Sequence, residues 1–462
     1  MLAILASLVV AAAEVGPAAV PLAADPDVRA LVEQALKNSP EVGRAEASAR
    51  AEVDRAPQVS ALPDPTLTLG IQNDGFNGIQ IGTMETSYWQ VMLTQPIPWP
   101  GKLSARAATA RAQASVASGE TARLRLTTTA EVERAYVDLV LVRGQIALLA
   151  KLEVLWKEAE VMARTRYEVG QGAQSDLLRA QLERTRLQQR RVALEGDERI
   201  RLQALNRLRV HPLDEPVSTP RPLSAFADPV LRAADEAVAD AERRSPDLVI
   251  AALVVQAADR RVDSARRDWF PDFAVTAGIM PRGQIEPMWT LQLGITLPVF
   301  GASKQGKAVE ESQSRREADL RGEEGVRQLV QLRAQERRTL LSAALQTLEI
   351  YRGGILVQSD ATVRSTLAQY QVGKVTFPSV LEVLRGLVVD EGGYLEALAS
   401  AQRLAIADDE VSLAPPDGLS GSGSGSSMPG AASVSTGGRA GGSGGSPQPA
   451  AVPAATGMPS GM

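Results

Sequence analysis

Four short motifs occur twice in this sequence, in the same order, with copies about 200 residues apart. Each motif contains a proline or a glycine, the residues that most often mark the end of a helix or strand. A constant order and spacing of this kind predicts an internal tandem duplication, with two copies of one structural unit in one chain. The pairs are Asn38-Ser39-Pro40 with Arg244-Ser245-Pro246, Leu62-Pro63-Asp64-Pro65 with Trp269-Phe270-Pro271, Gln95-Pro96-Ile97-Pro98-Trp99-Pro100-Gly101 with Leu297-Pro298-Val299-Phe300-Gly301, and Tyr167-Glu168-Val169-Gly170 with Tyr370-Gln371-Val372-Gly373.

The two copies have the same predicted plan. The first spans 25–211 and the second 229–412, and the proline-rich residues 212–228 are expected to link them. In each copy a helix leads through prolines into a β-hairpin, and a long helical hairpin with a glycine at its turn follows. The expected ranges are 29–58 and 229–268 for the first helix, 66–97 and 272–298 for the β-hairpin, and 102–208 and 303–410 for the helical hairpin, whose first helices cover 102–167 and 303–370.

The two ends of the chain differ in composition from the rest. Residues 1–13 are apolar but too few to span a bilayer as a helix, which is typical of an export signal. We predict a signal peptide over about 1–24, cleaved at Ala11-Ala12-Ala13 or at Ala23-Ala24; a buried N-terminal helix is the alternative. Residues 413–462 are rich in Gly, Ser, Ala and Pro and nearly uncharged, which predicts a disordered tail.

The hairpin strands alternate between apolar and polar residues. Leu67, Leu69 and Ile71 alternate with Thr and Gln in the first strand, and the other strands have the same period of two. A half-buried sheet of a soluble protein shows this pattern too. A transmembrane sheet is favoured because the strands have nearly the length of a tilted spanning strand, are uncharged at their centres and are flanked by aromatic residues. The predicted aromatic girdle consists of Trp89, Trp99, Trp269, Trp289 and Phe300.

Four strands are too few for a closed barrel, which needs about eight. In lipid, an open sheet edge would leave backbone N–H and C=O groups without partners, at several kcal/mol for each group. We therefore expect copies of the chain to share one transmembrane β-barrel, to which each contributes four strands. The number of copies does not follow from this argument.

The long helices contain an apolar heptad, which predicts antiparallel coiled-coil packing against the returning helix. Their other faces are rich in Arg, Glu and Gln, which is typical of a solvated surface and also fits a tunnel wall that is wet on both sides. The predicted fold class is therefore a mixed α/β membrane protein with a long α-helical coiled-coil tunnel and a transmembrane β-barrel. The heptad residues are Val132, Ala135, Leu139, Val142, Ile146, Leu149 and Trp156.

Composition argues against an enzyme, a metal protein and a nucleic-acid-binding protein. The sequence has no cysteine, and its one histidine, His211, precedes a proline in the linker without a partner at ligand spacing. It contains no phosphate-binding glycine loop and no nucleophile elbow, so we predict no catalytic residue, no cofactor and no metal site. Met428, Met458 and Met462 are too scattered to indicate a soft-metal site. The net charge of −5 provides no basic field for nucleic acid.

The order of these motifs resembles that of the TolC family of outer-membrane efflux proteins. The resemblance covers about 29–412, and its most specific elements are the two Tyr-x-Val-Gly turns at 167–170 and 370–373. It implies a homotrimer with a twelve-stranded barrel in outer-membrane lipid and a helical tunnel that crosses the periplasm. The hairpin loops, 73–87 and 281–288, would then face outside the cell.

In this family the glycine turns lie at the periplasmic tip, where the helical hairpin of a periplasmic adaptor (membrane-fusion) protein docks. Energy for transport would come from an inner-membrane pump of the resistance-nodulation-division type. Glycine at these positions also has a purely structural explanation, since it provides a positive φ after a helix end. The resemblance assigns adaptor docking to Val169, Gly170, Gln171, Gly172, Val372, Gly373 and Lys374.

Family members also carry acidic residues at the closed periplasmic entrance, just after the second turn. Here Glu382 keeps one acid and Ser379 replaces the other, while Asp176 stands at the position of the first copy that is equivalent to Ser379. The resemblance therefore assigns a periplasmic gate to Glu382 and Asp176. A solvated helix carboxylate is the alternative for Glu382.

Alternatives remain for the cargo and for the class of protein. The Leu62-Pro63-Asp64-Pro65 and Pro100-Gly101-Lys102 motifs are similar to the heavy-metal-cation branch of the family, which implies metal cations or small toxic compounds as cargo. One duct fold serves several pumps, so a type I secretion channel is an alternative. A soluble periplasmic coiled-coil adaptor or scaffold would share the heptads but does not need uncharged, aromatic-flanked strands.

Overall fold

The computed structural model describes residues 20–415. The predicted signal peptide lies outside the described residues as far as residue 19, and the predicted tail does so from residue 416 onward. Val20 pairs with Phe226 through a single β-bridge, and Leu22 is buried. The N-terminal segment 20–24 therefore packs against the predicted linker.

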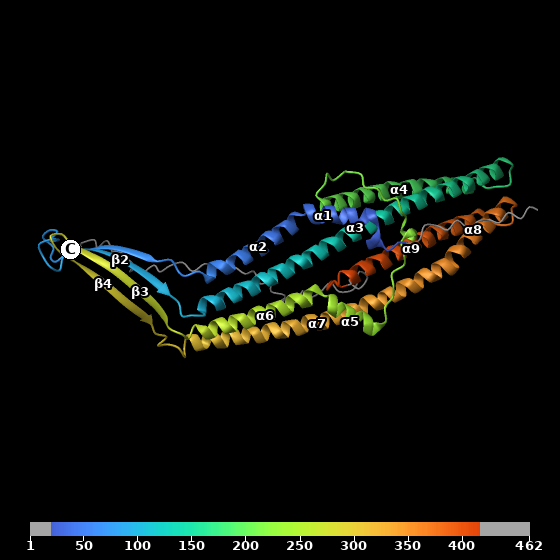
Figure 1. Cartoon of the computed structure of the whole chain (residues 1–462). Coiled ribbons are helices and arrows are strands. Elements are labelled where there is room, and N and C mark those ends of the chain that lie inside the picture. Colours follow the sequence, from blue (N-terminus) through green and yellow to red (C-terminus); the bar gives the residue numbers. More distant parts are fainter. Residues whose placement is uncertain (1–19, 416–462) are drawn as a thin grey trace, which may run out of the picture. The chain divides into compact units, whose positions relative to one another are not determined.

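The predicted strands form one antiparallel sheet in the order β1-β2-β3-β4 (Figure 1). Its strands are β1 (Thr66–Gln72), β2 (Tyr88–Ile97), β3 (Asp272–Arg282) and β4 (Ile285–Thr296). The register places apolar residues on one face, because Leu67 is opposite Leu93, Leu93 is opposite Ala277, and Ala277 is opposite Leu291. The pairing of β2 with β3 joins strands from the two halves of the sequence.

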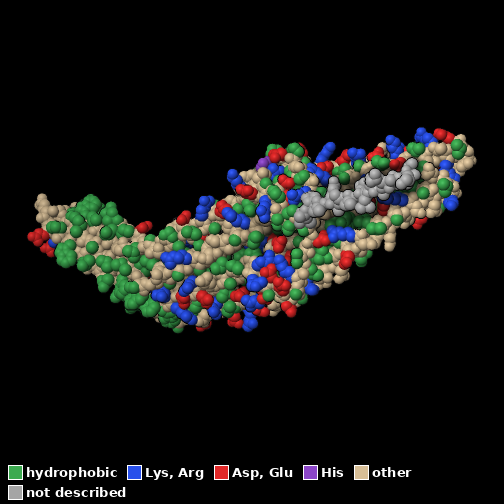
Figure 2. Space-filling view, turned by 45° about the vertical axis from the view of Figure 1, so that its right-hand side comes forward, with side chains coloured by type: hydrophobic (Ala, Val, Ile, Leu, Met, Phe, Trp, Pro, Cys, Tyr) green, Lys and Arg blue, Asp and Glu red, His purple; other side chains and the backbone are tan. Residues whose placement is uncertain are grey.

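The apolar face of this sheet is exposed. Leu69, Trp289 and Leu293 have 70%, 77% and 68% of their surface accessible. Hydrophobic side chains gather over the strands, whereas charged side chains are spread over the helices (Figure 2). Within residues 20–415, β1 and β4 each pair with a strand on one side only, so the sheet has two open edges.

The second β-hairpin is tighter than predicted. We expected a loop over 281–288, but β3 continues to Arg282 and β4 begins at Ile285. Gly283, with φ 68°, lets the chain reverse within a short turn. A side chain at this position would lie 2.9 Å from the Cα of Gly82, so the two hairpin ends approach closely.

The expected first helix of each copy is two helices, which corrects the prediction. The breaks lie at Ser39 and Ser245, whose ψ angles are 119° and 114°. Each serine precedes a proline, which disfavours the helical conformation, and each serine Oγ accepts a hydrogen bond from a backbone N–H in the next helix. The helices are α1 (Pro26–Asn38), α2 (Pro40–Ser60), α5 (Ala234–Arg244) and α6 (Pro246–Arg267).

Two long helical hairpins follow the β-hairpins (Figure 1). The first consists of α3 (Lys102–Glu168) and α4 (Gln174–Arg209), and the second of α7 (Gln305–Ile350), α8 (Leu356–Gln371) and α9 (Phe377–Asp409). The helix expected over 303–370 is interrupted by a π-helical turn, Tyr351–Ile355, between α7 and α8. This turn contains Gly353-Gly354, and glycine weakens the preference for regular α-helix.

Helix α3 contributes much of the core. Val132, Leu139 and Trp156 of the predicted heptad are buried, with at most 1% of their surface exposed, whereas Ala135 and Ile146 are half-buried. The packing is broader than predicted, because α3 packs against α2, α6 and α9 as well as the returning α4. One apolar cluster surrounds Tyr136, and another joins Trp156 to Phe377 nearer the helical turns. No helix within residues 20–415 is both long and apolar enough to cross a bilayer.

Candidate functional site

Two helical turns carry the residues predicted to dock an adaptor. The first turn joins α3 to α4, and the second joins α8 to α9. Gly170 has φ 74° in the first turn, and Gly373 has φ 77° in the second. Glycine adopts this left-handed conformation without steric cost, which explains why both Tyr-x-Val-Gly motifs end in glycine.

Both turns close with the same hydrogen bonds. In the first turn the N–H of Gly170 donates to the carbonyl of Tyr167 at 3.0 Å, and the N–H of Gln171 donates to that of Arg166 at 2.8 Å. The same two bonds recur at the matching residues of the second turn. This is the Schellman arrangement, which gives partners to carbonyls at a helix end.

Arg166 brings the two turns together, a contact that we did not predict. Its Nη1 donates to the carbonyl of Tyr370 at 2.7 Å, and its guanidinium carbon lies 4.9 Å from the centroid of the Tyr370 ring. Its Nη2 donates to the carbonyl of Gln171 at 3.4 Å. One side chain from the end of α3 thus contacts both turns. Tyr370 lies 204 residues further along the chain, so no local sequence pattern could have revealed the contact.

Most of the predicted docking residues are exposed around these turns. Val169 and Val372 follow the last residues of α3 and α8 and are 62% and 68% exposed. Gly172 differs, since it is half-buried against the backbone of Arg166. An apolar side chain beside open backbone offers a partner helix both contact area and hydrogen-bonding groups. The other exposed members of the set are Gly170, Gln171, Gly373 and Lys374.

The two predicted gate acids lie on different helices. Asp176 lies in the first turn of α4 and is half-buried, whereas Glu382 lies in the second turn of α9 and is exposed. Among residues 20–415, neither carboxylate takes part in an ion pair. The charge of Asp176 acts on Tyr370: burial first, and then this carboxylate, raise the pKa of the Tyr370 hydroxyl.

Other acids join the helices near the turns. Glu183 of α4 is buried, and its carboxylate accepts hydrogen bonds from Arg186 at 2.6 Å and from Arg385 of α9. Burial acts to raise the pKa of Glu183, but the bonds from Arg385 and Arg186 outweigh it and leave the pKa below its ordinary value. Glu160 of α3 pairs with Arg184 of α4 at 2.5 Å, and this hydrogen bond lowers the pKa of Glu160. Glu160 and Glu183 are therefore exceptions to the expectation that most helix charges are solvated.

The predicted girdle residues lie toward both ends of the strands. Trp89 and Trp289 belong to the apolar face and are 49% and 77% exposed. Trp269 and Phe300, beside the helical ends of the strands, are 44% and 73% exposed. These four aromatic side chains are thus accessible to whatever surrounds the sheet.

Trp99 has a structural role at the junction of sheet and helices. Its ring stacks on Phe270 and Phe273, with centroids 5.4 and 5.6 Å away, and its backbone N–H donates to Asp272 at 2.9 Å. The buried Lys102, the first residue of α3, places its Nζ 2.9 Å from the same carboxylate. Asp272 is the first residue of β3. These contacts fix the start of α3 to the sheet.

The described residues show one local pairing at the histidine and no metal cluster. The Nδ1 of His211 lies 3.0 Å from a carboxylate oxygen of Glu215, four residues later. Over residues 20–415, no three or more His, Cys, Asp or Glu side chains are grouped so as to hold a metal ion.

Comparison with known proteins establishes the family. The family described as outer membrane efflux protein matches residues 31–210 and 237–407, more than half of the chain. The outer-membrane channel OprN is 20% identical, with a TM-score of 0.70 over 84% of this chain and 90% of that chain. CusC is 16% identical, with a TM-score of 0.72 over 84% of this chain and 92% of that chain. The open state of the MtrE channel of Neisseria gonorrhoeae is 17% identical, with a TM-score of 0.70 over 84% and 89%.

No curated protein matches the sequence. At these low identities, the solved structures establish a shared fold. Members of the matched family are transport ducts rather than enzymes, and they lie in the cell outer membrane and extend into the periplasm. The match over more than half of the sequence shows that the chain belongs to the outer membrane efflux protein family.

Proposed function

We propose that three copies of this chain form the exit duct of a tripartite efflux system. Family members form trimers and work with adaptors and inner-membrane pumps. In this proposal each copy adds four strands to a twelve-stranded β-barrel, and the long helices of both sequence copies continue the duct through the periplasm. The predicted signal peptide would direct export, and cleavage at the first of its two predicted sites, Ala11-Ala12-Ala13, would leave the packed segment 20–24 in the mature chain.

The observation that carries this proposal is that the four-stranded sheet has an exposed apolar face and two open edges. Its apolar face exposes Leu69, Trp289 and Leu293, which favours contact with lipid. The opposite face carries Thr68 and Gln292, which suit a wet lumen. The open edges at β1 and β4 would pair with those of the neighbouring copies, so that every backbone group has a partner in the bilayer.

Disulfide crosslinking tests the shared barrel, because the chain has no cysteine of its own. Thr68→Cys in β1 is combined in turn with Met288→Cys, Thr290→Cys and Gln292→Cys in β4. Oxidation of outer-membrane fractions should give, for at least one pair, a crosslinked species of three chains. The control pair, Thr68→Cys with Met92→Cys, lies directly opposite within one sheet and should crosslink inside a single chain. A water-soluble monomer and no intermolecular crosslink from any pair would contradict the proposal and favour the adaptor alternative.

We further propose that the two helical turns dock the helical hairpin of the adaptor. Val169 and Val372 would supply the apolar contacts, and the exposed backbone of the turns would supply hydrogen-bonding groups. Val372→Asp should then reduce the amount of adaptor that co-purifies with the duct. Val389→Asp is the matched control, because Val389 is 70% exposed on α9 away from the turns. Equal losses in the two variants would argue against docking at the turns.

Glu382 is proposed to act at the periplasmic gate. Three symmetry-related copies would bring like charges together at a constriction, which favours the passage of cations. Glu382→Ala should enlarge single-channel conductance in lipid bilayers and weaken the cation preference, whereas Asp235→Ala, at an exposed acid of α5, should change neither. An unchanged conductance and ion preference in Glu382→Ala would remove this residue from the gate. Asp176→Ala extends the same measurement to the other candidate acid.

The proposed cargo is metal cations or small toxic compounds, on the basis of the motifs at 62–65 and 100–102. Capture of the duct from its native membrane, with the adaptor and pump identified by mass spectrometry, tests this directly. A resistance-nodulation-division pump supports the proposal. An ATP-driven secretion transporter would replace it with type I secretion.

A further inference from the structure

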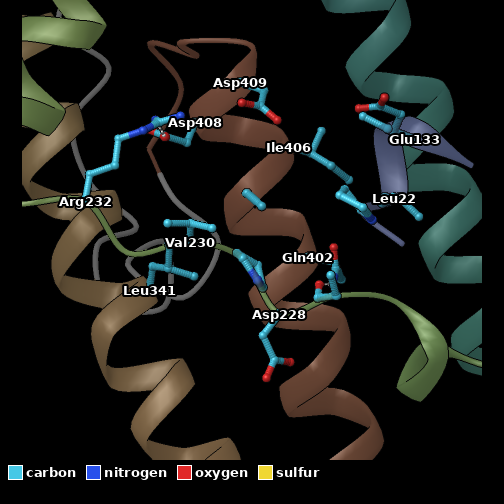
Figure 3. A pocket seen from close by; sticks show the side chains of 15 residues that line it. Leu22, Glu133, Asp228, Val230, Arg232, Leu341, Gln402, Ile406, Asp408 and Asp409 are labelled. Atoms are coloured by element: carbon cyan, nitrogen blue, oxygen red, sulfur yellow. Dashed lines mark hydrogen bonds and ion pairs between the residues drawn. The ribbon is translucent and has the colours of Figure 1, made fainter. Parts of the chain in front are cut away.

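A cavity of about 250 Å³ lies between α3, α9, the N-terminal segment and the chain around 227–232. It is separate from the helical turns and from the sheet. Leu22, Leu341 and Ile406 form buried parts of its apolar wall, and the exposed Val230 lies at its rim (Figure 3). A concave wall that is mostly apolar, with a minority of polar groups, is typical of a site for an organic molecule.

The charged groups that line this cavity are mostly acidic. Three of the carboxylates have an arginine partner: Asp408 lies 2.8 Å from Arg232, Asp228 lies 2.5 Å from Arg352, and the more exposed Asp409 lies 3.7 Å from Arg244. The fourth carboxylate, that of Glu133 on α3, lies at the same end of the cavity as Asp409 of α9 and faces it (Figure 3). The charged lining residues are Glu133, Asp228, Arg232, Asp408 and Asp409.

Glu133 is the unusual member of this set. It is only 9% exposed, and within residues 20–415 its carboxylate has neither a hydrogen bond nor an ion pair. A buried carboxylate without a compensating partner is costly, and it responds by holding its proton or by taking up a cation. Burial, and next the negative charge of Asp409, raise the pKa of Glu133 to about 7, against the opposing effect of Arg134.

Charged groups surround Glu133 from α9 and from the side of α1. Asp409 on α9 is 61% exposed at the side chain, and its nearest cation, Arg244, is 3.7 Å away. On the side of α1, Glu133 also borders a groove whose charged residues are Arg29, Glu33, Lys37 and Arg125. Arg29 donates to the carbonyl of Ala23, and Arg125 pairs with Glu46, so two of these cations already have partners.

We propose that the cavity binds a small organic cation, with its ammonium group between Glu133 and Asp409 and its apolar body against Leu22, Leu341 and Ile406. The volume is below the roughly 300–1,000 Å³ of pockets for drug-sized ligands, which limits the ligand to a small amine. A metal ion fits less well, because the described residues hold no grouping of three or more metal-ligating side chains, and the remaining walls are largely apolar. The binding of a cation would favour the ionised form of Glu133 and release its proton.

Titration calorimetry on the full-length protein in detergent tests the proposal, with cyclohexylammonium as the probe and cyclohexanol as its neutral analogue. The amine should bind and the alcohol should not. Because the carboxylate must be ionised and its pKa is about 7, affinity for the amine should be about tenfold lower at pH 6 than at pH 8. The amine stays charged at both pH values, so this difference reports on the protein.

Glu133→Gln keeps the shape of the side chain and removes its charge, so it should lower the affinity at least tenfold and abolish the pH dependence. Glu131→Gln is the matched control: Glu131 lies on the same helix but is exposed, and the wild-type affinity should persist. Equal binding of amine and alcohol, unchanged affinity in Glu133→Gln, or no binding by the wild-type protein would each overturn the proposal. If Glu133→Gln failed to fold, the pH dependence of the wild-type protein would remain decisive.

Discussion

The two helical turns share one backbone conformation and differ in the environment of their tyrosines. Tyr370 is 2% exposed, and its ring centroid lies 5.5 Å from that of Phe377. Tyr167, at the matching position of the first turn, is 44% exposed. The difference arises after the turn, because α9 begins with Phe377 whereas α4 begins with Gln174. The Tyr-x-Val-Gly motif determines the backbone, and the next helix determines whether the tyrosine is buried.

The two turns also differ in the residue that precedes each tyrosine, near the ends of α3 and α8. Arg166 precedes Tyr167 and reaches across to Tyr370, whereas Gln369, which precedes Tyr370, forms its side-chain bond with Ser365 on its own helix. The second turn thus depends on a residue near the first turn. Matched substitutions in the two turns should therefore have unequal effects on stability, and these inequalities test the comparison.

The largest effect is expected from Tyr370→Ala. Removal of a buried aromatic ring should reduce the local free energy of unfolding by about 3 kcal/mol. Tyr167→Ala, at the exposed position, should change it by less than about 0.5 kcal/mol. Amide hydrogen exchange over 165–176 and 368–379 measures both values in the same protein. Similar losses of protection in the two variants would show that the burial of Tyr370 adds nothing to the second turn.

A smaller effect is expected from Arg166→Lys, which keeps the charge but loses the planar guanidinium. The loss of the hydrogen bond to the Tyr370 carbonyl and of the ring contact should cost about 1 kcal/mol. Protection should fall in both turns, because Arg166 contacts both. Arg164→Lys is the control, since Arg164 is exposed and pairs with Glu160 within α3. Loss confined to the first turn would show that the contact with Tyr370 does not stabilise the second.

What the sequence revealed depended on the range of each interaction. The strands were predictable because their alternation is local, and the glycine turns because Gly170 and Gly373 serve a local hydrogen-bond pattern. The helix breaks at Ser39 and Ser245 also had a local signal, a serine before a proline, which we did not use. The predicted docking residues lie in these two turns, so predicting the turns also located the docking residues.

Contacts between distant segments could not be predicted in this way. Glu133 illustrates the limit: its neighbours in the sequence look like those of any charged helix residue, and its burial depends on the N-terminal segment and on α9. The same holds for Glu183, whose partner Arg385 lies 202 residues further along. A charged residue on a long helix is usually solvated, so only the fold distinguishes the few that are not.

The smallest effect concerns the carboxylates that link the helices near the turns. The pKa of Glu183 in the folded protein lies below its ordinary value of 4.5, so the folded state binds this proton more weakly than the unfolded state does. Its stabilisation is therefore fully present above about pH 4.5 and is lost as the pH falls through the folded-state pKa. Since Arg385 is half exposed, we expect the loss to be only about 0.5 kcal/mol. Hydrogen exchange in α4 and α9 between pH 6 and pH 3 should show this decline in the wild-type protein and a shallower one in Glu183→Gln. If the variant declined as steeply, the pair would not couple α4 to α9, and the connection between the two hairpins near their turns would rest mainly on Arg166.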